Sequence, residues 1–196
     1  MSTFSIPRPE GLTTARLELA PLQHCNALEL LDYQLKNKLH LQETSPQPPA
    51  DYYTEEFWQR KIWSSTQDWN KGCAIRFVIR MTDRPEIIGT LKFSQIFRGP
   101  LHSCFLGYNV DEEFENLGLM TEALEKSITY LFEVWNLHRV QANYLVDNKK
   151  SARVLEKLGF TIEGLAPKYL YIKDGWHDHI ISSLINENWN DAYLND

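Results

Sequence analysis

The stretch Asn116-Leu117-Gly118-Leu119-Met120-Thr121 decides the fold of this chain, because it joins a polar, acidic loop to a long amphipathic helix. Apolar residues recur from there at spacings of three and four, which predicts a helix with one apolar face: Leu119, Ala123, Leu124, Ile128, Leu131, Phe132 and Trp135. Residues 103–110 and 140–146 flank this helix and have strand-like patterns. A helix that connects two strands of one sheet makes them parallel, so we expect a parallel pair here.

The rest of the chain predicts an antiparallel meander with helices around it. The other expected elements are a strand within residues 12–22, helices over 26–36 and 54–70, a proline-rich loop over 43–49, strands over 74–80 and 87–97, a helix over 151–158, and strands over 160–165 and 176–184. Thr54 and Asn148 are expected N-caps, Gly159 ends the short helix, and Gly89 forms a bulge. The expected class is α/β, with a mixed, mostly antiparallel sheet flanked by helices.

Composition excludes several classes of protein. The chain has 196 residues, of which 43% are apolar and 23% charged, as in an ordinary folded domain rather than a disordered or collagen-like chain. It has no apolar run long enough to span a bilayer, and residues 1–8 lack the apolar core of a secretory signal. We therefore expect a cytoplasmic protein.

Charge and cysteines narrow the possible partners. The chain has 20 basic and 26 acidic residues, so it lacks the basic footprint of a nucleic-acid-binding protein and better suits a basic peptide or an amine. Cys25, Cys73 and Cys104 are too widely spaced for a metal or redox site, so we expect small buried residues in a reducing compartment and no bound metal.

Two segments of the sequence contain residues suited to binding a phosphate group. The loop before Leu119 leads from a strand into a helix N-terminus, where free N–H groups and the helix dipole favour an anion such as phosphate. The second place, Asn148-Lys149-Lys150-Ser151-Ala152-Arg153, sets three cations around a helix N-terminus, where they oppose the dipole unless a polyphosphate binds. The simpler alternatives are a tight turn into a helix and a solvated basic turn.

Taken together, these places resemble the GNAT acetyltransferases. Four runs carry the resemblance: Leu106-Gly107-Tyr108-Asn109-Val110; Gly118-Leu119-Met120-Thr121-Glu122-Ala123-Leu124; His138-Arg139-Val140-Gln141-Ala142-Asn143; and Asn148-Lys149-Lys150-Ser151-Ala152-Arg153-Val154-Leu155-Glu156-Lys157-Leu158-Gly159-Phe160. Within that family the chain is most similar to the RimJ/RimL branch of ribosomal-protein N-terminal acetyltransferases, and the RimJ side is closer. The resemblance covers about residues 12 to 190, the expected core of a single domain over 1–196.

The resemblance implies a splayed sheet with acetyl-CoA wedged between strands 103–110 and 140–146, and a primary amine as acceptor. Its pantetheine arm would pair along the backbone of Tyr108, Asn109 and Val110. Its pyrophosphate would lie on the N–H groups of the loop and helix start: Asn116, Leu117, Gly118, Leu119, Met120 and Thr121. Asn148 would hold the arm, and Arg153 would reach the phosphates.

The phosphate loop departs from the family pattern. The family usually has Gln or Arg at the first position and two small residues later, whereas this chain has Glu113, then Asn116, and only Gly118 remains. Asn tolerates positive φ better than most residues, so the turn can persist. Glu112, Glu113 and Glu115 would repel a pyrophosphate unless they point away, which leaves a weakened or repurposed enzyme as an alternative.

Transfer of an acetyl group to an amine needs an acid for the departing thiolate. Many relatives use a tyrosine seven residues after the asparagine, but Leu155 stands there in this chain. The resemblance to RimL implies Ser151 in this role. The alternative is that Ser151 is only a first-turn residue of the helix.

The sequence does not single out one residue as the general base that removes the proton of the amine. Relatives place a glutamate where this chain has Asn143 or Leu170. The remaining candidates are His102, Glu43 and a water molecule held by Asn143, and His102 has the side chain whose ordinary pKa suits proton abstraction.

Residues 37–53 and the early helices are expected to select the acceptor, because long loops are often functional. Acidic side chains there would receive a cationic peptide or amine, and the neighbouring aromatic side chains are equally compatible with core: Glu43, Asp51, Glu55, Glu56, Tyr52, Tyr53, Phe57 and Trp58. The leading hypothesis is an acetyltransferase for the N-terminal alanine of a ribosomal protein, as a monomer or homodimer. The alternatives are a small-amine or antibiotic acetyltransferase and a non-catalytic CoA-sensing or protein-binding module.

Overall fold

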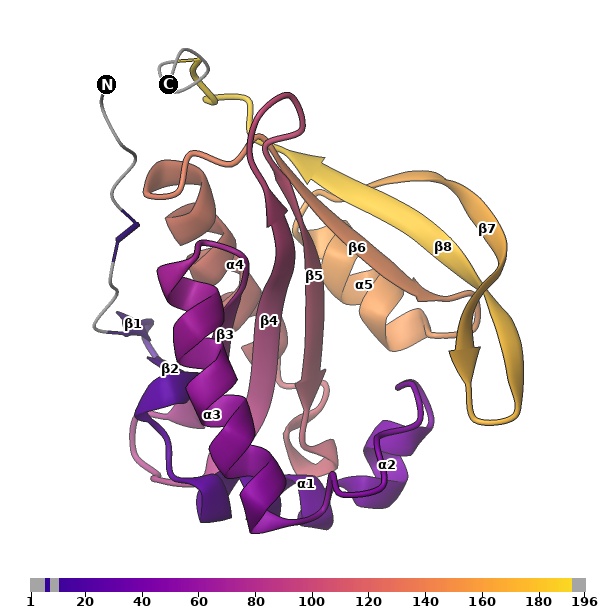
Figure 1. Cartoon of the computed structure of the whole chain (residues 1–196). Coiled ribbons are helices and arrows are strands. Elements are labelled where there is room, and N and C mark those ends of the chain that lie inside the picture. Colours follow the sequence, from indigo (N-terminus) through magenta and orange to yellow (C-terminus); the bar gives the residue numbers. More distant parts are fainter. Residues whose placement is uncertain (1–5, 8–10, 192–196) are drawn as a thin grey trace.

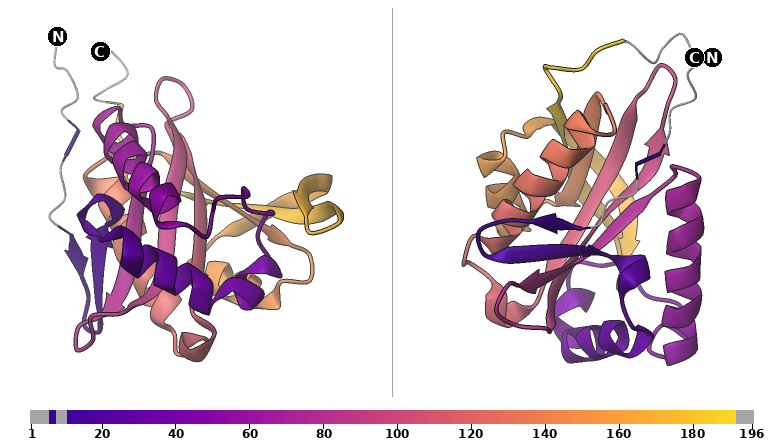
Figure 2. Two further views of the ribbon diagram at one scale, coloured as in Figure 1. Left: turned by 60° about the horizontal axis from the view of Figure 1, so that its bottom comes forward. Right: turned by 90° about the vertical axis from the view of Figure 1, so that its left-hand side faces the viewer.

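The described residues form an eight-stranded sheet covered by helices on both faces (Figures 1 and 2). The structure is a computed structural model, and it describes residues 6–7 and 11–191. The strand order is β1-β2-β3-β4-β5-β6-β8-β7. Most of residues 1–8, for which the sequence argued against a secretory signal, lie outside the described residues, as do both ends of the expected domain.

The elements follow the expected order with some additions. They are β1 (Leu12–Thr13), β2 (Leu17–Pro21), η1 (Leu22–His24), α1 (Ala27–Lys36), α2 (Lys38–Gln42), α3 (Glu55–Asn70), β3 (Ile75–Met81), β4 (Ile87–Phe97), β5 (Ser103–Val110), η2 (Glu112–Phe114), α4 (Leu119–Glu133), β6 (Arg139–Leu145), α5 (Lys149–Lys157), β7 (Thr161–Ile172) and β8 (Gly175–Ile185). The predicted α/β class with a mixed sheet is confirmed.

All neighbouring strands are antiparallel except β5 and β6, which are parallel. The helix α4 connects these two strands, so the prediction of a parallel pair across this crossover is confirmed. Thr54 and Asn148 cap α3 and α5 through their side chains, which confirms both predicted N-caps, and Asn26 caps α1 in the same way.

The sheet separates two apolar clusters. On one face, α4 buries Leu124 and Leu131 against core residues of the strands such as Phe77 and Phe93. On the other face, α1 and α3 bury a smaller cluster, and Figure 2 (right) shows α3 and α4 on opposite sides of the strands. Tyr52, Phe57 and Trp58 contact one another in or against this second cluster, so the core interpretation of these aromatic residues is confirmed.

Several predicted boundaries need correction. The short helix α2 occupies part of the segment expected as a loop over 37–53, and α5 begins at Lys149, two residues earlier than predicted. β7 continues to Ile172 rather than ending at 165, because register shifts between Ile162 and Gly164 and between Ala166 and Leu170 let pairing with β8 resume. The bulge predicted at Gly89 falls next to it, where Ile88 is skipped in the register with β3.

Cysteine burial agrees only in part with the expectation. Cys104 is buried and burial raises the pKa of its thiol to about 12, whereas Cys25 is half-buried and Cys73 is exposed. Among the described residues, no helix combines the length and apolar character needed to cross a membrane. Within the same residues, no group of three or more His, Cys, Asp or Glu side chains is placed to hold a metal ion.

Candidate active site

The strands β5 and β6 pair only over their first four residues and then diverge. Their register ends at Leu106 opposite Ala142, while β5 continues to Val110 and β6 to Leu145 (Figure 1). A cavity of about 940 Å³ opens where they separate. Its walls come from the ends of β5 and β6, the starts of α4 and α5, the segment after α2, and the β7–β8 hairpin.

Tyr108, Asn109 and Val110 line the cavity along the free edge of β5. The Tyr108 hydroxyl donates to the Ser151 carbonyl at 3.5 Å, and burial raises the pKa of Tyr108 to about 12. Because these residues pair with β4 but not with β6, one edge of the strand is open to a ligand that can form main-chain hydrogen bonds.

Helix α1 holds the end of β5 in place. Asn109 Oδ1 accepts hydrogen bonds from the Tyr33 hydroxyl at 2.7 Å and from Thr90 Oγ1 at 3.0 Å. Asp111 accepts from Asn37 and forms an ion pair with Lys36 at 2.7 Å. Burial acts to raise the pKa of Asp111, but hydrogen bonds from Lys36, the Glu113 N–H and Asn37 outweigh it, so this pKa lies below its usual range.

The N-terminus of α4 opens onto the cavity without a side-chain cap. Gly118 precedes it with a φ of 75°, and Asn116 has a φ of 59°, so the asparagine adopts the positive φ expected of it. Asn116, Gly118 and the first three residues of α4 line the cavity. Leu117 does not, because its side chain is 55% exposed, so it can contribute only through its backbone.

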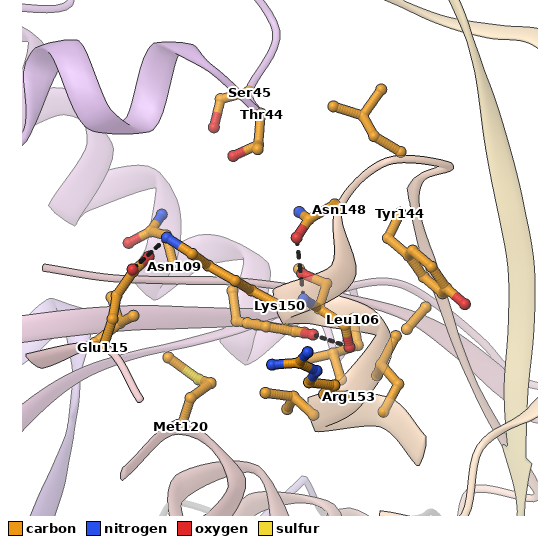
Figure 3. Close-up of a pocket in the computed structure, with 18 of the residues that line it drawn as sticks. Thr44, Ser45, Leu106, Asn109, Glu115, Met120, Tyr144, Asn148, Lys150 and Arg153 are labelled. Atoms are coloured by element: carbon orange, nitrogen blue, oxygen red, sulfur yellow. Dashed lines mark hydrogen bonds and ion pairs between the residues drawn. The ribbon is translucent and has the colours of Figure 1, made fainter. Parts of the chain in front are cut away.

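The three acids of the loop have different positions. Glu112 is exposed, and Glu113 is exposed and forms an ion pair with Lys36 outside the cavity lining. Glu115 instead lies in the cavity wall, where its side chain is 13% exposed and pairs with Lys150 and with His40 (Figure 3). Glu115 is therefore the one acid of the three that faces the predicted phosphate site. Its carboxylate is already paired with Lys150, one of the three cations at the start of α5.

The start of α5 brings together the residues expected from the second motif. Asn148 Oδ1 accepts from the Ser151 N–H at 3.0 Å, and Asn148, Ser151 and Arg153 all line the cavity (Figure 3). Lys149 and Lys150 are in the same lining. Leu155, which stands where relatives have a tyrosine, is buried in the core.

Of the candidate bases, Asn143 and Glu43 line the cavity and His102 does not. Asn143 lines the cavity and its Nδ2 donates to the Tyr169 hydroxyl at 2.8 Å, and Glu43 lines the rim in an ion pair with Lys173 at 2.6 Å. His102 lies just before the paired start of β5 and outside the cavity lining, so its position does not support the predicted role as a base. It is buried there with its ring against Trp189 and its Nδ1 bonded to the Gly99 carbonyl.

Sequence reasoning missed several lining residues. Thr90 and Lys92 come from β4, and Tyr169 and His179 come from the β7–β8 hairpin. The polar alternation within 87–97 could have identified Thr90 and Lys92 as one face of a strand. The hairpin gave no such signal, because its place beside the cavity depends on the strand order.

The site fits a ligand with a long polar arm and several phosphates. It has an open strand edge, an uncapped helix N-terminus and the three cations Lys149, Lys150 and Arg153, whose repulsion by the α5 dipole a phosphate would relieve. The fold and this site define the chain as an acetyltransferase, and residues 16–161 match the family described as Acetyltransferase (GNAT) domain. The chain belongs to this family, whose acetyl donor is acetyl-CoA.

Known relatives place the chain more narrowly. It is 35% identical to the [ribosomal protein uS5]-alanine N-acetyltransferase of Escherichia coli K12 over 91% of this chain and 92% of that protein. It superposes on the ribosomal-protein-S5-alanine acetyltransferase of Vibrio fischeri with a TM-score of 0.88 and 34% identity, covering 92% and 98% of the two chains. It also superposes on Mycobacterium smegmatis RimJ in complex with CoA-disulfide with a TM-score of 0.82 and 26% identity, covering 87% and 82%.

Proposed function

We propose that this protein transfers the acetyl group of acetyl-CoA to the N-terminal α-amine of a ribosomal protein, with the alanine terminus of uS5 as the first candidate. One observation carries the proposal, namely the 35% identity to a uS5-alanine acetyltransferase over 91% of this chain and 92% of that relative. Such even coverage argues for one shared domain, and we take residues 1–196 as a single domain with its core at about 12–190.

The proposed cofactor contacts follow the open strand and the two helix starts. The pantetheine arm pairs with the backbone of Tyr108, Asn109 and Val110, and the pyrophosphate lies on N–H groups between Asn116 and Thr121. Asn148 holds the arm and Arg153 reaches the phosphates. The lining positions of these residues, Leu117 excepted, support the assignment.

Ser151 is the proposed donor to the departing thiolate. It lies in the first turn of α5, beside Asn148 and the Tyr108 hydroxyl, and it lines the cavity where β5 and β6 separate. A backbone N–H of β5 is the proposed donor to the developing oxyanion. Two candidates remain for removal of the amine proton: Glu43, or a water molecule held by Asn143.

The small-amine alternative is less well supported. A small cationic acceptor needs a closed acidic pocket, but the described lining has only the acids Glu43, Glu115 and Asp147, and two of these are paired with lysines. The open cavity better suits a polypeptide terminus. A non-catalytic role is disfavoured by membership of an acetyltransferase family.

Mass spectrometry of peptides tests the proposal directly. The purified protein is incubated with acetyl-CoA and a peptide that reproduces the uS5 N-terminus, and a gain of about 42 Da at the α-amine is expected. The matched control is the same peptide with its α-amine blocked but its lysines free. Acetylation of the control alone, or of neither peptide, would contradict α-amine transfer to this terminus.

A further inference from the structure

Three cations gather on the face of the sheet that α3 covers. Arg76 on β3 and Lys92 on β4 are directly opposed in the antiparallel register. Lys61, on α3, lies close enough to feel the charge of both. Directly opposed like charges destabilise a pair of strands, and because Lys92 is exposed to solvent, its charge is accessible to an anion from outside the protein.

The protein itself supplies a carboxylate to this group of cations, from Asp68 on α3. Asp68 accepts a hydrogen bond from Arg76 Nη1 at 2.8 Å. Arg76 Nε is buried and has no hydrogen-bond partner within the described part of the chain. Burial and the Arg76 charge lower the pKa of Lys92, and burial, Arg76 and Lys92 lower that of Lys61. One carboxylate, Asp68, therefore lies among three cations, and it is bonded to Arg76 rather than to Lys92.

Lys92 connects this group to the active-site cavity. It lines the cavity together with Thr90, which is two residues away and so on the same face of β4. Its side chain crosses β5 at Gly107, where an added Cβ would lie 3.7 Å from Lys92 Cε. The core side chains Leu91 and Phe93 alternate with it and point to the α4 face. Lys92 thus reaches the cavity from the face of the sheet opposite α4.

We propose that Lys92, backed by Lys61 and Arg76, binds a carboxylate of the acceptor polypeptide. The inference rests on the proposed function, because it requires a peptide as acceptor. Because Lys92 lines the same cavity that would receive the peptide N-terminus, the carboxylate belongs to an Asp or Glu close to the acetylated amine. The enzyme should then prefer N-termini that carry such an acid.

Two peptides that differ only by Glu and Gln at one early position test the carboxylate site. We expect the wild-type protein to show a kcat/KM about tenfold higher for the Glu peptide at low salt, with the ratio shrinking as ionic strength rises. In Lys92→Gln the ratio should fall to about one, and Lys92→Glu should favour the Gln peptide. Lys126→Gln, which removes an exposed charge on α4 outside the cavity lining, should keep the wild-type ratio.

Three outcomes would overturn the assignment. Equal kcat/KM for the two peptides with the wild-type protein would exclude a carboxylate site while leaving α-amine acetylation intact. An equal loss of kcat for both peptides in Lys92→Gln would mean that Lys92 acts on the reaction rather than on the acceptor carboxylate. No turnover of either peptide would contradict the proposed function itself, and this site with it.

Discussion

The Ser151 hydroxyl is the proposed proton donor to the departing thiolate. Replacing it with alanine removes the proposed proton donor but keeps the backbone N–H that Asn148 caps. We expect Ser151→Ala to lower kcat by about 100-fold or more, because general acid catalysis typically contributes about 10²- to 10⁴-fold. Calorimetric titration with acetyl-CoA should give an unchanged Kd. An unchanged kcat would remove Ser151 from the chemistry and leave it as a helix residue.

Glu115 is expected to limit the affinity for acetyl-CoA. Its carboxylate pairs with Lys150 inside the cavity, where it competes with a phosphate for that cation. Glu115→Gln should therefore lower the Kd for acetyl-CoA by about three- to tenfold, measured by calorimetry at low salt.

Glu112 provides the matched control for Glu115. It is exposed and lies outside the cavity lining, so Glu112→Gln makes the same change in net charge without touching the site. Its Kd should stay near the wild-type value. Weaker binding by Glu115→Gln alone would mean that Glu115 orients Lys150 for the cofactor rather than competing with it.

Sequence analysis of single residues succeeded where the residues of the site are close together in the chain. Asn148, Ser151 and Arg153 are close in the chain, so one helix start brings them to the cavity. The choice of His102 rested on its chemistry alone, whereas the structure places it just before the part of β5 that is paired with β6, away from the cavity lining. Lys92 and Glu115 acquire their roles from partners far away in sequence, which a local pattern cannot show.

The end of β5, which pairs with β4 but no longer with β6, depends on the glycine opposite it. A Cβ at Gly89 would lie 2.8 Å from the Asn109 carbonyl oxygen, so Gly89→Ala must displace the end of β5. We expect the free energy of unfolding to fall by about 1–3 kcal/mol and the Kd for acetyl-CoA to rise. Denaturant unfolding and calorimetry measure the two effects.

Gly164 supplies the control for this glycine, because an added Cβ there meets nothing within 4 Å. Gly164→Ala on β7 should change neither the stability nor the affinity appreciably. Wild-type affinity in a destabilised Gly89→Ala protein would argue that the end of β5 does not contact the cofactor.

The first turn of α4 is tied to the start of the chain through Glu122. This carboxylate accepts hydrogen bonds from Thr14 and Arg16 and pairs with the Arg16 guanidinium at 2.6 Å. Burial acts to raise the pKa of Glu122, but these bonds outweigh it and hold the pKa below its ordinary 4.5. A lowered native pKa stabilises the fold above the unfolded value, and that stability is lost as pH falls through the native value.

Glu122→Gln should therefore destabilise the protein by about 1–2 kcal/mol at neutral pH, since hydrogen bonds to a charged group are lost. The difference from wild type should shrink as pH falls below about 4.5, where Glu122 of the unfolded chain takes up a proton, and should vanish once pH is below the lower native pKa. Urea unfolding at several pH values measures this difference. Glu125→Gln, on the exposed side of α4, should show no such dependence, and a pH-independent gap for Glu122→Gln would contradict the account.

Most elements were predictable because periodicity and caps agree in them. The helices α3 and α4 combine apolar spacing with clear starts at Thr54 and Gly118. The helix α2 was missed because five residues are too few to establish a period, and prolines follow soon after it. β7 was cut short at 165 because its pairing with β8 is interrupted between Ala166 and Leu170 and resumes only at Leu170 opposite His177, which a local pattern does not show.

The candidate active site lies where the parallel strands β5 and β6 diverge, and the fold of the whole chain forms the walls around it. The crossover helix and its flanking strands made that pair predictable from the sequence, whereas the proposed position of the cofactor between them came from the resemblance to the GNAT acetyltransferases. The opposite wall was not predictable, because contacts such as Glu43 with Lys173 join segments 130 residues apart. Such contacts follow from the strand order, in which β8 rather than β7 lies next to β6.

Hydrogen–deuterium exchange with and without acetyl-CoA tests the central claim most directly. If the cofactor lies between β5 and β6, peptides covering 107–110, 116–121 and 148–153 should gain protection when it binds. Peptides from α3 should exchange as before, because that helix covers the other face. Binding that protects α3 while leaving the three cavity segments unchanged would contradict the account.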